Sequence, residues 1–341
     1  MNYGYDEFLE KLEDLFVLTP YMEEIIEDID EAIRIAQVKN FTKQPTCILV
    51  TGNSGAGKTT LREYYEGKYP RKSVPTPNGE KDIVPIFGTT LQDDKNPKAA
   101  PGHMLRDLGD FLQGKGGTRS ELGDRFIFKV NAAEVQAIFV DEFQNAIESD
   151  SDRIVSNTAN WVKSIVNLTK RPVVLFGMPW SKVVIDSSTE LINRFEIIHH
   201  LEEYDRDNFD DWLKFLEEVN NQLPFEKSSN LNEPELALRL LAASKGNLSK
   251  LMKGIIKPAA RIAYKQGASS ISVEHLLKAA VKTQRIPKKI NPLSVKNMLI
   301  DDIEIVHEIT ERHQHKPYAM NPGRKYIIVQ ENMSANEVLS K

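Results

Sequence analysis

The feature that most constrains the fold of this chain is a glycine-rich loop between an apolar run and a helical pattern. Residues 47–50 are continuously apolar, and helical composition begins again at residue 59. The loop consists of Gly52, Asn53, Ser54, Gly55, Ala56, Gly57, Lys58 and Thr59. Glycine permits backbone conformations in which successive N–H groups point at a phosphate, and the next helix adds its positive end. The pattern predicts a phosphate-binding loop between a strand and a helix, with Thr60 included in the site. An ordinary glycine turn is the alternative.

The chemistry expected of this loop depends on two of its side chains and on an acidic pair further along. Lys58 can reach the β and γ phosphates of ATP, and the Thr59 hydroxyl can bind Mg²⁺. A second apolar run, residues 137–140, ends in Asp141 and Glu142. We expect Asp141 to hold the magnesium ion and Glu142 to orient and polarise the attacking water. The sequence therefore predicts an ATPase with ATP and Mg²⁺ as cofactors.

The other strand and helix signals predict the fold class. Residues 172–176 are another continuously apolar run, and residues 83–87 are a weaker one. Strands that are apolar on both faces are typical of a parallel sheet covered by helices. Helical patterns occupy residues 5–39, 209–222, 234–244, 248–265, 273–283 and 294–312. We expect an α/β fold, a P-loop NTPase with a parallel sheet flanked by helices, a helical lid domain and an extended C-terminal tail.

Length and composition fit more than one domain. The chain has 341 residues, 40% of them hydrophobic, which is enough for an α/β domain and a smaller helical one. The expected domains are an acidic helical segment at 1–40, the nucleotide-binding core at 41–205, the lid at 206–286 and a partner-binding tail at 287–341.

Charge and hydropathy limit the kinds of molecule that the chain is expected to bind. No apolar run approaches the roughly 20 residues that span a bilayer, and the single cysteine, Cys47, fits a reducing compartment. We therefore expect a cytoplasmic protein without membrane contact. The net charge of −5 gives the chain as a whole no attraction for nucleic acid, so DNA would have to meet a local basic patch.

A third signal is the segment 191–195, in which Arg194 follows Asn193. An arginine that reaches a neighbouring subunit's phosphates stabilises the charge of the transition state and makes hydrolysis depend on assembly. Arg194 is the candidate for this arginine finger. A surface salt bridge is the alternative.

With these motifs in this order, the chain resembles the AAA+ ATPases and, more closely, the TniB/TnsC family of transposition regulators. The features that carry the resemblance are the acidic helical segment before residue 47 and the segments 137–145, 173–179 and 190–195. The resemblance covers residues 1–285. It implies that Lys58 and Thr59 are the Walker A pair, that Asp141 and Glu142 are the Walker B pair, and that Arg194 is the finger.

The resemblance also implies a function. Such proteins oligomerise with ATP on double-stranded DNA as a ring or filament, and link a TniQ-type targeting factor to the transposase in bacterial cytoplasm. ATP hydrolysis, expected to be slow, drives disassembly. Two departures concern the sensor positions. Gly177 and Met178 stand where a polar first sensor is usual, and the second sensor is expected at Lys250, or at Ser249, in place of an arginine.

The DNA contacts of the family come from the stretch between the two Walker motifs. Here that stretch carries a glycine-rich segment at 114–118 and a group of cations that includes Lys95, Lys98, Arg106, Lys115, Arg119 and Arg125. We expect Lys95, Lys98, Lys115 and Arg119 to be the DNA-binding residues. A few cations per subunit, repeated along a filament, can bind phosphates without reading the base sequence. A solvated loop with scattered lysines is the alternative.

Two other functions are compatible with the motifs. One is a helicase loader or replication initiator of the same superfamily, which predicts a helix-turn-helix or a helicase-binding extension. The other is a nucleotide-gated signalling switch that ignores DNA.

Overall fold

The computed structural model describes residues 4–77, 79–91, 100–147, 152–285, 287–308 and 326–331. Its contacts divide the chain into two compact units. We call the described part of Pro20–Leu201 the sheet unit, and the described parts of Met1–Thr19 and Glu202–Asn332 the helical unit. The expected helical segment at 1–40 thus supplies helices to both units.

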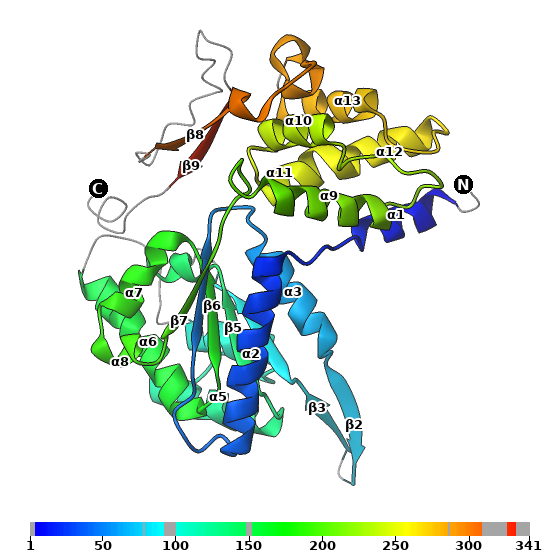
Figure 1. Ribbon diagram of the computed structural model, residues 1–341. Coiled ribbons are helices and arrows are strands. Elements are labelled where there is room, and N and C mark those ends of the chain that lie inside the picture. The colour runs from blue at the N-terminus through cyan, green and yellow to red at the C-terminus, as the bar shows by residue number, and fades with distance from the viewer. Residues whose placement is uncertain are drawn as a thin grey trace. The chain divides into compact units, whose positions relative to one another are not determined.

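A five-stranded sheet forms the centre of the sheet unit (Figure 1). Its strand order is β4-β5-β6-β1-β7. The strands are β1 (Ile48–Gly52), β4 (Ile86–Thr90), β5 (Ala137–Asp141), β6 (Val173–Gly177) and β7 (Ile197–Leu201). Every neighbouring pair is parallel, so the carboxyl ends of all five strands lie on the same side of the sheet unit. Every residue of β1, β5 and β6 is buried, as their continuous apolar sequences predict.

Helices cover both faces of this sheet. One face, which includes Leu49 and Leu175, packs against apolar residues of α4 (Ala100–Asp107), α5 (Arg119–Ala132), α6 (Asp152–Thr169), α7 (Val183–Asp186) and α8 (Thr189–Ile192). The other face contacts α2 (Pro20–Val38) and α3 (Lys58–Lys68). The Tyr65 ring of α3, for example, lies 5.3 Å from the Phe139 ring of β5. The prediction of a parallel sheet flanked by helices is therefore confirmed.

Short elements connect this framework. A hairpin of β2 (Lys72–Thr76) and β3 (Gly79–Ile83) precedes β4, and the 3₁₀ helices η1 (Phe143–Ala146) and η2 (Pro179–Lys182) follow β5 and β6. The α5 helix begins at a capping box, in which Thr118 and Glu121 exchange side-chain and backbone hydrogen bonds.

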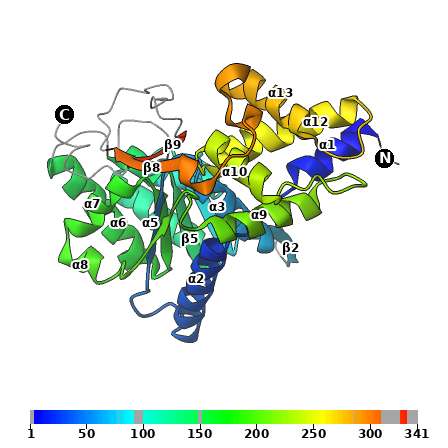
Figure 2. The same cartoon turned by 45° about the horizontal axis from the view of Figure 1, so that its top comes forward.

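The helical unit consists of α1 (Tyr5–Glu13), α9 (Phe209–Gln222), α10 (Pro234–Ser244), α11 (Leu248–Leu251), a π-helical turn (Met252–Ile256), α12 (Lys257–Lys265) and α13 (Val273–Gln284). Figure 2 shows α1 beside α12, where the Phe8 and Tyr264 rings lie 4.3 Å apart. Trp212 is fully buried, and its Nε1 donates to the Ala237 carbonyl at 2.9 Å. The chain continues through η4 (Lys288–Ile290), η5 (Pro292–Ser294) and η6 (Ile300–Asp302) to β8 (Ile303–Glu308), which pairs in parallel with β9 (Tyr326–Glu331).

The structure corrects two sequence predictions. The weak strand expected at 83–87 is β4 at Ile86–Thr90, because residues 79–83 pair in the hairpin instead. The helix expected at 294–312 is not formed over its described part, which has 3₁₀ turns and β8, while residues 309–312 lie outside the described residues. Ile303, Ile305 and Val306 are β-branched, a residue class that is enriched in strands.

Within the described ranges, no helix has the length and apolar character that crossing a membrane requires.

Candidate nucleotide-binding site

The glycine-rich loop joins the end of β1 to the start of α3. Gly55 and Gly57 have φ values of 85° and 106°, a backbone region that side chains disfavour. At Gly52, a Cβ atom would lie 2.9 Å from the Leu201 carbonyl oxygen of β7, so the close approach of β7 requires glycine there. The loop therefore has the backbone that a phosphate cradle needs. It leads directly into the first turn of α3, whose N–H groups have no acceptor within the helix.

Lys58 is the first residue of α3 and is 7% exposed. Its Nζ donates to the Gly52 carbonyl at 2.6 Å and to the Asn53 carbonyl at 3.0 Å. The ammonium group is thus held against the loop, so that its positive charge lies among the backbone groups expected to face a phosphate.

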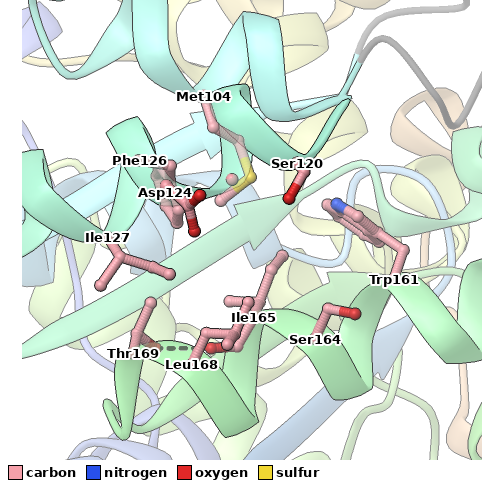
Figure 3. A pocket seen from close by; sticks show the side chains of 11 residues that line it. Met104, Ser120, Asp124, Phe126, Ile127, Trp161, Ser164, Ile165, Leu168 and Thr169 are labelled. Carbon is pink, nitrogen blue, oxygen red and sulfur yellow. Dashed lines mark hydrogen bonds between the residues drawn. The ribbon is translucent and has the colours of Figure 1, made fainter. Parts of the chain in front are cut away.

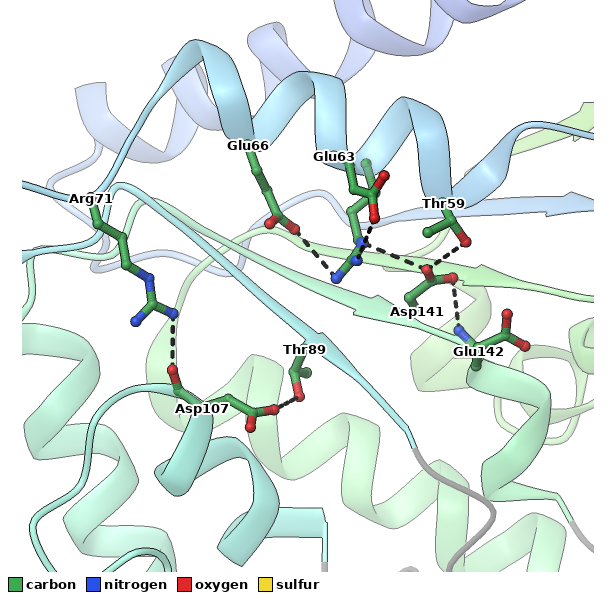
Figure 4. A network of polar contacts seen from close by, with 9 residues as sticks. Thr59, Glu63, Glu66, Arg71, Thr89, Asp107, Asp141 and Glu142 are labelled. Atoms are coloured by element: carbon green, nitrogen blue, oxygen red, sulfur yellow. Dashed lines mark hydrogen bonds and ion pairs between the residues drawn. The ribbon is translucent and has the colours of Figure 1, made fainter. Parts of the chain in front are cut away.

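Thr59 and Asp141 meet at the carboxyl edge of the sheet (Figure 4). The Thr59 hydroxyl donates to Asp141 Oδ2 at 2.8 Å, and the Glu142 backbone N–H donates to Asp141 Oδ1 at 2.8 Å. Asp141 is only 1% exposed. Hydroxyl and carboxylate oxygens beside a phosphate loop are the ligand set that Mg²⁺ prefers, so these two residues fit a magnesium ion bound with a nucleotide.

Arg62 is the nearest cation to this carboxylate among the described contacts, and sequence analysis missed it. Its Nε lies 3.5 Å from Asp141 Oδ2, and its two terminal nitrogens lie 3.6 Å from Glu66 and 3.8 Å from Glu63. Burial raises the pKa of the Glu66 carboxyl. Arg62 follows Thr59 by three positions, so both face the same side of α3, and that spacing could have identified it.

Glu142 follows β5 directly and has φ 53° and ψ 39°, the left-handed region. Its carboxylate accepts a hydrogen bond from the Gln144 side-chain amide. The Gln144 Oε1 atom in turn accepts from the Met178 backbone N–H at 3.2 Å. Gln144 and Met178, which are 34 positions apart in the sequence, are therefore hydrogen-bonded beside Glu142, the residue expected to activate water.

Arg194 lies at the amino ends of the strands, opposite to the ends that carry the glycine-rich loop. In the parallel pair of β1 and β7, Ile48 is opposite Ile197 and Gly52 is opposite Leu201. Arg194 precedes Ile197, and its carbonyl accepts a hydrogen bond from the N–H of Cys47 before β1. The structure therefore does not bring Arg194 to the Lys58 loop of its own chain.

The Arg194 side chain is held by nearby polar groups. One terminal nitrogen pairs with Glu190 at 2.7 Å and the other donates to the Gln44 side chain. Hydrogen bonds from Asn167 and from Arg194 lower the pKa of the Glu190 carboxyl.

Of the other predicted site residues, Lys250 belongs to α11 of the helical unit, and the Asn247 side chain caps that helix at 3.0 Å. Lys95 and Lys98 lie outside the described residues. Lys115 is exposed in the loop after α4, and Arg119 is the first residue of α5.

The loop that presents Lys115 is held by polar contacts of Asp110 and Arg125. Asp110 is 3% exposed, accepts from the Gly114 N–H at 2.9 Å and pairs with Arg125 at 3.1 Å. Arg125 also donates to the Lys115 carbonyl at 3.0 Å. Arg125 therefore has a structural role in this loop.

A separate cavity of about 460 Å³ lies between α4, α5 and α6 (Figure 3). Its lining is mainly apolar and includes Phe126, Trp161 and Ile165, with Asp124 as an acidic member. Since phosphate binding needs backbone N–H groups or cations, this cavity is a poor nucleotide site, and the glycine-rich loop is the candidate.

Comparison with known proteins identifies a family and similar folds. A protein-family model described as "Bacterial TniB protein" matches residues 9–205. No curated protein matches the sequence. In structure, the chain resembles the ORC2 protein of Aeropyrum pernix in its ADPNP–ADP complexes, with a TM-score of 0.54, 14% identity, and coverage of 80% of this chain and 71% of that one. It also resembles CDC6P of Pyrobaculum aerophilum, with a TM-score of 0.55, 13% identity, and coverage of 82% and 73%.

Proposed function

Because the chain belongs to the bacterial TniB family and has an AAA+ fold like that of ORC2 and CDC6P, we propose that it is an ATP-dependent regulator of DNA transposition. It assembles on double-stranded DNA with ATP, links target-site selection by a TniQ-type protein to the transposase, and disassembles after hydrolysis. The observation that supports this most strongly is the meeting of Thr59 with Asp141 beside the glycine-rich loop.

In the proposed chemistry, the N–H groups of residues 52–60 and the Lys58 ammonium bind the phosphates of ATP. Magnesium, held by Thr59 and Asp141, would neutralise charge on the β and γ phosphates. Glu142 accepts a proton from water and orients it toward the γ phosphate. The ORC2 structure was obtained with ADPNP and ADP, which supports an adenine nucleotide.

Arg194 is proposed to act on a second copy of the chain. A five-residue strand at about 3.3 Å per residue separates the amino and carboxyl ends of the strands by roughly 13 Å. The glycine-rich loop lies at the carboxyl ends, and Arg194 lies at the amino ends. An arginine at the amino ends can complete a phosphate site only in a neighbouring subunit. For the helical unit, we propose that Lys250 is the second sensor, a residue that binds the nucleotide.

The DNA contacts are proposed at Lys95, Lys98, Lys115 and Arg119. Lys115 is exposed on a loop that Asp110 and Arg125 hold in place, so the cation is presented without a large loss of loop entropy. The net charge of −5 means that a single subunit attracts DNA weakly, so we expect binding to require assembly and to decrease steeply with salt. The transposase or the targeting protein is proposed to bind residues 287–341 or the acidic helices before residue 40, in the bacterial cytoplasm.

A helicase loader or replication initiator is the second candidate, because the fold of this chain is similar to that of ORC2 and CDC6P. These likenesses, at 14% and 13% identity, concern the fold. The two functions differ in their assemblies: a transposition regulator coats duplex DNA of any sequence, while a loader binds a helicase.

Electron microscopy of the protein with magnesium, duplex DNA and a non-hydrolysable ATP analogue tests the proposal. We expect rings or filaments on DNA that disappear in high salt or without nucleotide. The Glu142→Gln variant should assemble with ATP itself and persist, because it binds nucleotide but turns over slowly. Absence of any assembly on DNA would contradict the proposal, and oligomers that form equally without DNA would favour a signalling switch.

A further inference from the structure

The side-chain amide of Gln144 connects the ends of two neighbouring strands. Gln144 lies in η1, the 3₁₀ helix after β5, and its NH₂ group donates to Oε2 of Glu142. Its Oε1 accepts the backbone N–H of Met178, the residue after β6. A backbone N–H can only donate, so the bond to Met178 fixes which end of the amide is oxygen and turns the NH₂ group toward Glu142.

This contact leaves Glu142 with one oxygen bound and one free. Oε2 is occupied by Gln144, whereas Oε1 accepts no hydrogen bond from the described residues. Glu142 also has a left-handed backbone, φ 53°, a region that residues other than glycine rarely adopt and that clusters at functional sites. A carboxylate anchored through one oxygen has a defined direction, and its second oxygen is available to a water molecule.

The structure also explains why this polar group comes from η1. At Gly177, the last residue of β6, a Cβ atom would lie 2.6 Å from the Ser181 hydroxyl oxygen and 3.3 Å from the Phe143 Cβ. Ser181 is fully buried, and its hydroxyl donates to the Met178 carbonyl at 2.6 Å. A side chain at 177 would therefore displace a satisfied buried hydroxyl. Gln144 brings an amide to the same strand end from the side of β5.

We infer that Gln144 is a positioning residue for hydrolysis: it orients the Glu142 carboxylate toward the attacking water and couples that orientation to the end of β6. This inference rests on the proposed ATPase function. Gln144 does not contact the phosphates in this account. It acts through Glu142, so its loss affects turnover and leaves nucleotide binding intact.

The test compares ATP hydrolysis and nucleotide affinity in Gln144→Met and Gln144→Glu. Gln144→Met keeps the length of the side chain and removes both hydrogen bonds. Gln144→Glu keeps an acceptor for Met178 and places an oxygen against Glu142 where a donor was. The matched control is Gln37→Met, the same change at an exposed glutamine of the sheet unit that bonds to Gln136. Each variant is measured with and without duplex DNA.

We expect kcat to fall on the order of 10- to 100-fold in both Gln144 variants, as for misplacement of a catalytic group by about 1 Å. The KM for ATP, the Kd for a non-hydrolysable analogue and the melting temperature should stay at the values of Gln37→Met. Wild-type turnover in Gln144→Met, with Glu142→Gln inactive, would overturn the inference and leave the proposed function standing. The inference would also be overturned if the Gln144 variants lost nucleotide affinity and thermal stability along with turnover, because such losses indicate a structural role. If the wild-type protein neither binds nor hydrolyses ATP, the proposed function itself fails.

Discussion

The Thr59 hydroxyl donates a hydrogen bond of 2.8 Å to Oδ2 of Asp141, across 82 positions of sequence. The contact joins the first turn of α3 to the last residue of β5, so the phosphate loop and the acidic strand end form one site. Because Asp141 is 1% exposed and lies beside Arg62, its carboxylate is held in place by the fold.

Replacing Thr59 tests this contact. Thr59→Val keeps the shape of the side chain and removes the hydroxyl, and Thr59→Ser is the matched control that keeps it. In Thr59→Val we expect the affinity for ATP with magnesium to fall about 10- to 100-fold, the range for loss of a hydrogen bond to a charged group. Calorimetric titration in EDTA should show equal affinities in the two variants. An equal loss with and without magnesium would contradict the metal-binding role.

The position of Arg194 at the amino ends of the strands leads to a mixing experiment. Arg194→Ala should retain nucleotide binding and lose about 10³-fold or more in turnover, as arginine fingers do. Lys58→Ala should bind nucleotide poorly but keep its own Arg194. In a mixture, the loop of the Arg194→Ala subunit can meet the arginine of the Lys58→Ala subunit, so we expect ATPase activity to reappear. Activity no greater than the sum of the separate variants would contradict an arginine shared between subunits.

Cys47 provides a test of the sheet core. It precedes β1 and is fully buried, and burial raises the pKa of its thiol to about 12. Since the thiolate is the reactive form, a thiol reagent near neutral pH should modify no cysteine in the folded protein and one after denaturation. Rapid modification of the folded protein would contradict this position for Cys47.

His275 gives the helical unit a dependence on pH. Its Nδ1 accepts from the Ser272 N–H at 3.1 Å at the start of α13, and its Nε2 contacts the Gln266 side-chain oxygen at 2.9 Å. Burial, and then the nearby Lys278 charge, lower the pKa of His275 below its ordinary value of 6.5. The folded state thus favours the neutral ring, so the unfolded state binds the proton more readily. The free energy of unfolding should therefore decrease as the pH falls below 6.5 and through the lower folded-state pKa.

The control for this prediction is His275→Gln, which keeps an acceptor for the capping box and does not titrate. Thermal unfolding at about pH 7.5 and about pH 5.5 should show a larger loss of stability in the wild-type protein than in the variant. Equal losses in the two proteins would contradict the role of His275.

The sequence predicted the elements whose physical signal is local. β1, β5 and β6 are buried on both faces and are apolar at nearly every position, so each was identified as a strand. The helices at 209–222 and 234–244 were predicted with the bounds of α9 and α10, because their apolar periods and start signals agree. Of the candidate site, the loop and the acidic pair were found because each is a contiguous motif.

The features that sequence analysis missed depend on contacts between distant segments. β7 is an edge strand in which only Leu201 is fully buried, so its sequence lacks the apolar run of the central strands. The strand β4 begins three residues later than predicted, because residues 79–83 pair with β2 in a hairpin that the sequence did not indicate. Gln144 was not identified as a partner of Glu142, because its bond to the Met178 N–H exists only once β5 and β6 lie side by side.

The most direct test of the account is the affinity of the purified, folded protein for a non-hydrolysable ATP analogue with magnesium, measured by calorimetry beside Lys58→Ala. We expect one nucleotide per chain for the wild-type protein and an affinity at least about 10-fold weaker for the variant, which loses a charged contact to phosphate. A wild-type protein that is correctly folded and binds no adenine nucleotide, or a Lys58→Ala variant with unchanged affinity, would contradict it.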